Sequence, residues 1–226
     1  MRRQGIVIGL LLACLPAVAQ AQSLSLSSGN ATGDCTGTSF HQGADASGTY
    51  LAAEWAAASH FPVGINRGRV RCTIRYTVTV TTGHKLVPGG MSGSANRIAL
   101  AQLSPLRLNG ASTGILVESA FTIDAGTPVN TTTTLNGGPR TSATLSLDRA
   151  VGAPAFESVC STASKSSFQL SAVVEFATAS NYVTPWPPEP YSDREQASMR
   201  GYRLFYTVVP CPTVRTAVPS GVTERP

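Results

Sequence analysis

The sequence predicts an all-β protein, an antiparallel β-sandwich of jelly-roll or immunoglobulin-like type with about seven or eight strands and two disulfides. Three observations support this fold class. Short runs of alternating apolar and polar residues are separated by Gly, Pro and Asn turns. Only 13% of the 226 residues are charged, about half the usual share, and Thr, Ser, Gly, Ala and Pro replace them. Finally, an even number of cysteines follows an export signal.

The first residues have the pattern of a secretory signal peptide. Arg2 and Arg3 form a basic start, residues 6–15 are apolar, and an Ala-x-Ala site ends at Ala21. We therefore predict a signal peptide over residues 1–21 and a secreted or periplasmic product.

A second interpretation of the same region involves Cys14. The stretch Leu-Leu-Ala-Cys that ends at Cys14 has the outline of a lipobox, and its use would anchor the chain through a lipid. The Ala-x-Ala site is better formed, which favours the soluble product. The apolar stretch at residues 5–18 is too short to span a bilayer, so we expect no transmembrane segment.

The charge pattern argues against a nucleic-acid partner. Loss of the signal peptide leaves 15 basic residues against 12 acidic ones, a net charge of +3. One cluster of arginines stands out: Arg67, Arg69, Arg71 and Arg75. This cluster fits two interpretations: a binding patch for polyanions, or the solvent-facing side of a strand. The small net charge and the absence of a nucleic-acid-binding motif favour the strand face.

Four cysteines remain in the exported chain: Cys35, Cys72, Cys160 and Cys211. Their number predicts two disulfides, and no Cys-x-x-Cys or neighbouring His predicts a zinc site. Of the three possible connectivities we favour Cys35–Cys72 with Cys160–Cys211, because each pair closes a shorter loop within one half of the chain. Each is expected to contribute roughly 3–4 kcal/mol to stability.

The N-terminal part of the mature chain has the weakest pattern. Residues 22–34 are predicted to form a flexible lead-in that can add a short edge strand. Residues 35–68 are rich in small residues and are predicted to be irregular. Residues 49–59 are rich in Ala. Helix propensity favours a helical turn there, whereas the surrounding pattern favours a strand, and both remain open.

The clearest element is a strand at residues 70–81. Apolar residues from Val70 to Val80 alternate with Arg and Thr, which predicts one buried and one solvent-facing side. Cys72 falls on the buried side. Further strands are expected at residues 98–103, 115–123, 129–135, 141–147, 168–176 and 202–208. Residues 35–211 thus form one predicted domain, with a Gly-rich loop at 89–94 and a disordered tail at 212–226.

No catalytic or metal-binding pattern is evident. His41, His60 and His84 lie far from one another in sequence, so we expect neither a metal nor a cofactor. Ser92 lacks the Gly-x-Ser-x-Gly spacing of a nucleophile elbow. A glycosidase needs two converging carboxyls. Glu118 and Glu175 lie on predicted strands and Asp193 and Glu195 in a loop, but no sequence feature brings two of these four together.

The best binding candidate is the Pro-rich segment at residues 184–191, which carries Trp186 and Tyr191. Such a segment favours polyproline II conformation, and aromatic rings on an exposed loop stack on sugar rings. The alternative is a rigid crossover with both rings packed against the sandwich edge, and we favour this alternative.

The order of motifs resembles one family. Arg-Cys-Thr-Ile at residues 71–74 follows a first cysteine at Cys35, and Ser-Val-Cys at 158–160 precedes the last strands. This order resembles the small secreted, disulfide-bonded β-domain proteins of bacteria and fungi that are classified as a domain of unknown function. The resemblance covers about residues 33–211 and implies a secreted β-sandwich without an assigned activity. Gly33-Asp34-Cys35-Thr36 departs from the Cys-Pro expected there, and no Trp precedes Cys160.

Together these observations predict an exported structural or surface-interaction protein, more in keeping with a binding protein than with an enzyme. The alternative is a carbohydrate-binding module or weak glycan-active enzyme that uses the Trp186 loop. A cell-surface glycan or protein is the partner expected under either hypothesis.

Overall fold

The computed structural model describes residues 23–35, 37–62, 69–89, 96–107, 114–136, 142–151, 153, 156–178 and 196–212. These residues form strands, turns and connecting segments, and none of them is helical. The all-β prediction is therefore confirmed. No helix able to cross a membrane occurs in this part of the chain.

The described residues form eleven strands. These are β1 (Leu24–Gly33), β2 (Thr38–Asp45), β3 (Gly48–Pro62), β4 (Arg69–Val80), β5 (His84–Pro88), β6 (Arg97–Arg107), β7 (Gly114–Ile123), β8 (Val129–Asn136), β9 (Ala143–Asp148), β10 (Ser167–Thr178) and β11 (Gln196–Pro210).

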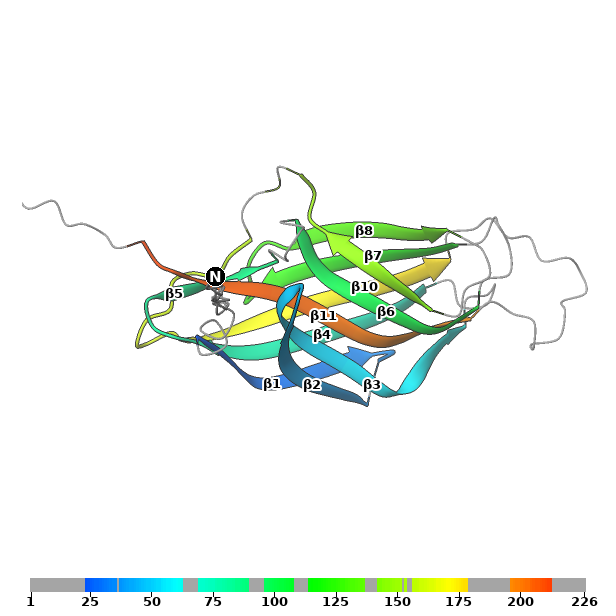
Figure 1. Cartoon of the computed structure of the whole chain (residues 1–226), viewed down its shortest axis with the longest axis horizontal. Coiled ribbons are helices and arrows are strands. Elements are labelled where there is room, and N and C mark those ends of the chain that lie inside the picture. The colour runs from blue at the N-terminus through cyan, green and yellow to red at the C-terminus, as the bar shows by residue number, and fades with distance from the viewer. Residues whose placement is uncertain are drawn as a thin grey trace, which may run out of the picture.

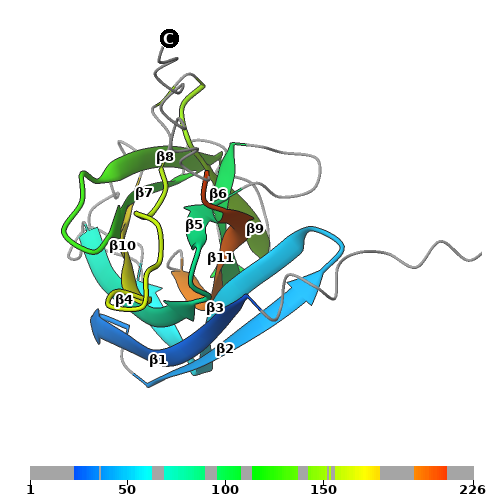
Figure 2. The same ribbon diagram turned by 90° about the vertical axis from the view of Figure 1, so that its left-hand side faces the viewer.

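The strands form two antiparallel sheets that face each other across one core, as Figures 1 and 2 show. Sheet A has the order β1-β4-β10-β7-β8. Sheet B has the order β2-β3-β11-β6-β9, and β5 pairs with the C-terminal part of β11. Because β1 lies beside β2 and β8 beside β9, the edges of the two sheets meet along both sides. This is the predicted β-sandwich.

The strand count exceeds the expected seven or eight, mainly because of the N-terminal region. The lead-in forms β1, an edge strand of ten residues, and the segment expected to be irregular forms β2 and β3. Residues 49–59 lie within β3 and are therefore extended. Ala-rich sequence has no strong strand propensity of its own, so pairing of β3 between β2 and β11 decides its conformation.

The predicted alternation on β4 positions the core. Cys72, Ile74, Tyr76 and Val78 are fully buried, whereas the intervening Arg and Thr side chains face outward. β10 continues the same two-sided pattern, with Phe168 directly opposite Val78. The same registers therefore create both the apolar interior and a polar outer face of sheet A.

The first disulfide joins Cys35 to Cys72, with their Cα atoms 5.5 Å apart. Next to it, the indole N–H of Trp55 on β3 donates to the Cys35 carbonyl oxygen at 3.3 Å. The Arg71 amide donates to the Asp34 carboxylate at 3.0 Å. The end of β1 is thus fixed both to β4 and to sheet B.

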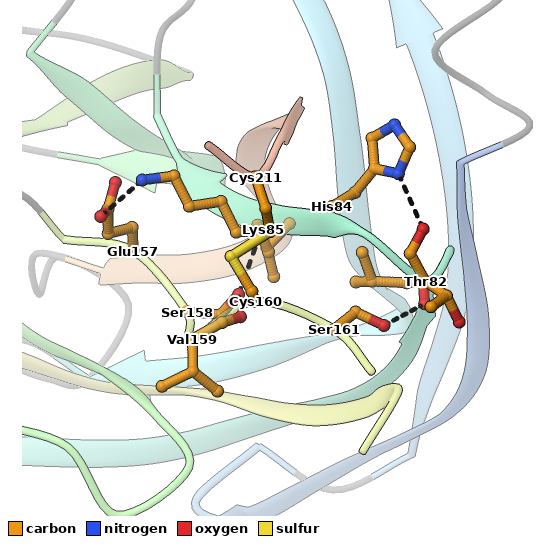
Figure 3. The surroundings of a disulfide bond; sticks show 11 residues. Thr82, His84, Lys85, Glu157, Ser158, Val159, Cys160, Ser161 and Cys211 are labelled. Atoms are coloured by element: carbon orange, nitrogen blue, oxygen red, sulfur yellow. Dashed lines mark hydrogen bonds and ion pairs between the residues drawn. A yellow bond between two sulfur atoms is a disulfide. The ribbon is translucent and has the colours of Figure 1, made fainter. Parts of the chain in front are cut away.

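The second disulfide joins Cys160 to Cys211, with Cα atoms 6.0 Å apart (Figure 3). It fastens the end of β11 to the segment at residues 156–161, which runs along β5. The Ser158 and Ser161 amides donate to carbonyl oxygens of β5, and Lys85 forms a 2.7 Å ion pair with Glu157. Both pairings are the ones favoured from the sequence.

A single glutamine bridges the junction between the edge strands β1 and β2. The Gln42 side chain accepts a hydrogen bond from the Leu26 amide and donates to the Leu24 carbonyl oxygen at 3.2 Å. It also donates to the Tyr206 hydroxyl at 2.7 Å. Burial raises the pKa of Tyr206 to about 12, although the hydrogen bond from Gln42 opposes this rise. Gln42 therefore satisfies backbone groups that an edge strand leaves unpaired.

Asp124 organises the turn between β7 and β8. It adopts a left-handed conformation with φ of 51°, which Asp tolerates better than most residues. Its carboxylate accepts hydrogen bonds from the Gln169 amide and the Lys165 ammonium, both at 2.9 Å. Partial burial alone would raise the pKa of Asp124, but the Gln169 and Lys165 donors together lower it.

The Asp124 pKa predicts an acid-sensitive contribution to stability. Because the folded-state pKa lies below the ordinary value, the contribution is present above about pH 4 and is lost as the pH falls through the lowered pKa. Asp124→Asn keeps the left-handed conformation accessible and removes the titration. Urea midpoints between pH 6 and pH 2.5 should therefore fall less for D124N than for the wild type, and equal falls would contradict this assignment.

The disulfides predict a large stability loss on their removal. The Cys35–Cys72 pair spans 37 residues, for which loop closure is worth about 4 kcal/mol in the chain-entropy relation. The double variant C35S/C72S should lower the free energy of unfolding by about this amount, and dithiothreitol should lower the melting temperature of the wild type. A transition that dithiothreitol leaves unmoved would contradict a stabilising role.

Candidate functional site

The two aromatic residues predicted to bind ligand, Trp186 and Tyr191, lie in residues 179–195, outside the described residues. Thr178 ends β10 of sheet A on one side of this segment, and Gln196 begins β11 of sheet B on the other. The segment therefore joins the two sheets at the end of the sandwich where β3 and β6 also end. Asp193, Glu195, Ser92 and Cys14 also lie outside the described residues.

The outer side of sheet A carries a group of polar side chains on neighbouring strands. We name this surface the hydroxyl face and define it by seven outward residues: Asn30, Thr73, Arg75, Thr77, Thr122, Gln169 and Ser171. All seven are exposed or half-buried. They occupy the outward positions of four neighbouring strands because their neighbours in sequence point into the core.

Arg75 lies at the centre of the hydroxyl face. Its backbone is directly opposite Asn30 on β1 and Ser171 on β10, and Ser171 is opposite Thr122 on β7. Arg75 is exposed, and no ion pair joins it to a carboxylate among the described residues. The residues directly opposite Arg75 on the two neighbouring strands are therefore a neutral amide and a neutral hydroxyl. This confirms that this part of the arginine cluster is on the outer face of a strand.

A charged row lies further along the same sheet, towards the end that carries Thr178. The Arg71 Nε is 3.3 Å from the Glu175 carboxylate, and Glu175 is directly opposite Glu118 on β7. The structure thus places Glu118 and Glu175 on adjacent strands directly opposite each other, which no sequence feature predicted. Strand alternation places both on the outer side, but only the register of β7 against β10 makes them neighbours. Arg71 binds one of the two, and we assign no catalytic step to the pair.

The outer side of sheet B has a different character. Tyr50, Ala52 and Phe205 form a small apolar cluster there, and Leu100 packs against it. The Arg203 guanidinium lies 4.6 Å from the centre of the Tyr50 ring, and its Nη1 donates to Asp45 at 2.9 Å. Asp45 and Arg203 lie on strands that flank β3. The cluster therefore fastens the β2–β3 hairpin to β11.

Tyr50 is not available to stack on a sugar ring. Its residue is only 8% exposed, and Arg203 covers the ring. A Cβ at Gly43 would lie 2.6 Å from the Tyr50 hydroxyl, so the glycine lets this ring lie against β2. The other described Tyr and Trp residues are buried as well: Trp55, Tyr76, Tyr202 and Tyr206.

The described histidines take part in local contacts. His41 lies 3.9 Å from Glu54 on the outer side of sheet B, and His84 forms a 3.3 Å hydrogen bond with the Thr82 carbonyl oxygen. His60 belongs to β3. No group of three or more His, Cys, Asp or Glu side chains among the described residues is arranged to hold a metal ion.

Neither a protein-family model nor a curated protein sequence matches the chain. Among solved structures, the chain is similar to the carbohydrate-binding module TmCBM61 in complex with β-1,4-galactotriose. The sequences are 7% identical, the match covers 81% of this chain and 89% of that chain, and the TM-score is 0.29. It is similar also to TmCBM27, a carbohydrate-binding module that recognises mannan, at 9% identity over 83% and 90% of the two chains with a TM-score of 0.24.

A third solved structure is the enzymatically active domain of tailspike protein 4 of bacteriophage CBA120. It is 13% identical, and the match covers 85% of this chain and 20% of that chain with a TM-score of 0.23. These similarities assign no ligand to this chain.

Arg203 on sheet B and Arg75 on sheet A predict different stability effects. Arg203→Ala removes an ion pair and a cation–π contact, so it should lower the free energy of unfolding by about 1 kcal/mol. Arg75→Ala is the matched control, and it should change stability by less than about 0.5 kcal/mol. Urea unfolding measures both. Equal losses would show that the Tyr50 cluster does not stabilise the hairpin.

Proposed function

We propose that the protein is an exported, non-catalytic surface-interaction protein that binds carbohydrate over the hydroxyl face of sheet A. One observation carries this proposal. Short hydroxyl and amide side chains on four adjacent strands surround Arg75, an arginine without a carboxylate partner among the described residues.

The chemistry of these side chains fits a hydroxyl-rich ligand. Thr and Ser hydroxyls donate and accept hydrogen bonds, and the Asn and Gln amides offer both kinds of group side by side. Sugars present the same mixture of donors and acceptors. The Thr and Ser side chains also lose less conformational entropy on ordering than Lys or Glu, so binding through them costs less.

Arg75 provides the directional hydrogen-bond donors that orient a ligand on this surface. A guanidinium offers five N–H donors in a planar arrangement and accepts no hydrogen bonds. Without a carboxylate partner on the sheet, these donors can bind ring or hydroxyl oxygens of a ligand. The flanking Ser171 and Asn30 can then bind the adjacent groups of the same ligand.

The rest of the molecule suits a fixed binding surface. Six of the seven residues of the hydroxyl face lie on the inner strands β4, β10 and β7 of sheet A, and β4 carries Cys72 of the first disulfide on its other side. A surface on regular strands holds its groups more rigidly than one on loops, which limits the entropic cost of binding. Export and two disulfides match a role outside the cytoplasm.

The Pro-rich segment that carries Trp186 offers a second place for recognition. In the chain it follows Thr178, the end of β10, by six residues. We retain this alternative because it predicts a different set of sensitive residues.

Affinity electrophoresis tests the proposal. The mature protein is run in native gels that contain hydroxyethyl cellulose, β-1,4-galactan, mannan or polygalacturonate, and we expect retardation in at least one of them. Ser171→Glu places a carboxylate against Arg75 and should weaken the affinity for that polysaccharide by at least about tenfold, which corresponds to about 1.4 kcal/mol.

Thr144→Glu on β9 is the matched control, since Thr144 is an exposed threonine on the outer side of sheet B. It should leave retardation unchanged. A loss of retardation in Trp186→Ala alone would move the site to the Pro-rich segment. No retardation in any of the four gels, or equal effects of S171E and T144E, would contradict the proposal.

A further inference from the structure

Four buried hydroxyl groups in the described part of the molecule have no hydrogen-bond partner in good geometry, although the Ser119 and Tyr202 hydroxyls lie near each other. They belong to Tyr76, Ser119, Thr131 and Tyr202, which are at most 4% exposed. Buried hydroxyls are normally hydrogen-bonded, because an unsatisfied one costs about 1–3 kcal/mol. Four such groups in one core therefore call for a physical explanation.

These hydroxyls are gathered between the two sheets. Ser119 on β7 and Thr131 on β8 are directly opposite each other, and both face the interior. Tyr202 on β11 of sheet B lies near Ser119. Tyr76 on β4 lies near Tyr202.

The pKa values of the two tyrosines support this arrangement. Burial raises the pKa of Tyr202, and the nearby Ser119 hydroxyl opposes that rise. Burial also raises the pKa of Tyr76, to which the neighbouring Tyr202 contributes. Both phenols are thus neutral at physiological pH and each retains a hydroxyl that can donate and accept.

Ser119 differs in size and polarity from the other inward residues of β7. The other inward positions of β7 carry larger apolar residues, including Val117 and Phe121, whereas Ser119 is small. The residue opposite Ser119 on β10 is Val174, which offers no polar group. Buried hydroxyls without protein partners are where proteins hold an ordered internal water, which typically makes about three hydrogen bonds.

We propose that Ser119, Thr131 and Tyr202 form an internal binding site for an ordered water molecule between the two sheets, with Tyr76 at its border. The water donates and accepts hydrogen bonds among these three hydroxyls. The neutral character of the site excludes an ion, because no charged group balances one there and burial of an unpaired charge is costly. The site is separate from the hydroxyl face, so it stands or falls independently of carbohydrate binding.

Oxygen-17 magnetic relaxation dispersion tests the site, because it counts internal waters with long residence times. Ser119→Val removes one hydroxyl, so the variant should lose one long-lived water relative to the wild type. Thr144→Val, an exposed change from hydroxyl to methyl on β9, is the control and should lose none. An unchanged count in a folded S119V protein would overturn the proposal.

A crystal structure of the wild type provides a second test that does not depend on the stability of S119V. We expect an electron-density peak within about 3.2 Å of the Tyr202, Ser119 and Thr131 hydroxyl oxygens. Direct hydrogen bonds among these hydroxyls, with no peak between them, would overturn the proposal.

Discussion

The strict alternation of β4 is the constraint on which the rest of the structure depends. Every second side chain from Cys72 to Val78 is fully buried, and each neighbour faces solvent. A slip of one residue against β1 or β10 would turn both sets over, which would expose the core and bury arginines. The apolar interior, the position of the first disulfide and the polar outer face of sheet A therefore follow from one register.

The two outer faces differ because they are built from different side chains. Sheet A presents short hydroxyl and amide groups around Arg75, whose guanidinium has no carboxylate partner in the described part of the protein. Sheet B pairs Arg203 with Asp45 and with the Tyr50 ring, and it pairs Arg97 with Asp148. These two arginines thus join neighbouring strands, whereas on sheet A Arg71 pairs with Glu175 and Arg75 keeps its donors for solvent or a ligand. This contrast is the basis of the functional proposal.

Sequence alone predicted the features that depend on one strand or on loop length. Alternation identified β4 and β10, and loop closure favoured the two disulfide pairings that the structure contains. It did not predict β2 and β3, because Ala- and Gly-rich chain takes its conformation from neighbouring strands. It also did not pair Glu118 with Glu175 or gather Ser119, Thr131 and Tyr202, since these depend on the registers of separate strands and on how the sheets pack. The Trp186 segment remains a prediction.

Carbohydrate binding by the hydroxyl face is the central claim, and threonine methyl spectroscopy tests it most directly. Mature protein labelled at the threonine methyl groups with carbon-13 is titrated with the polysaccharide that retards it most strongly in gels. Our account predicts shifts of the Thr73, Thr77 and Thr122 signals, while the Thr144 signal on sheet B stays in place. Shifts confined to Thr184 in the Pro-rich segment, or to threonines of sheet B, would contradict it.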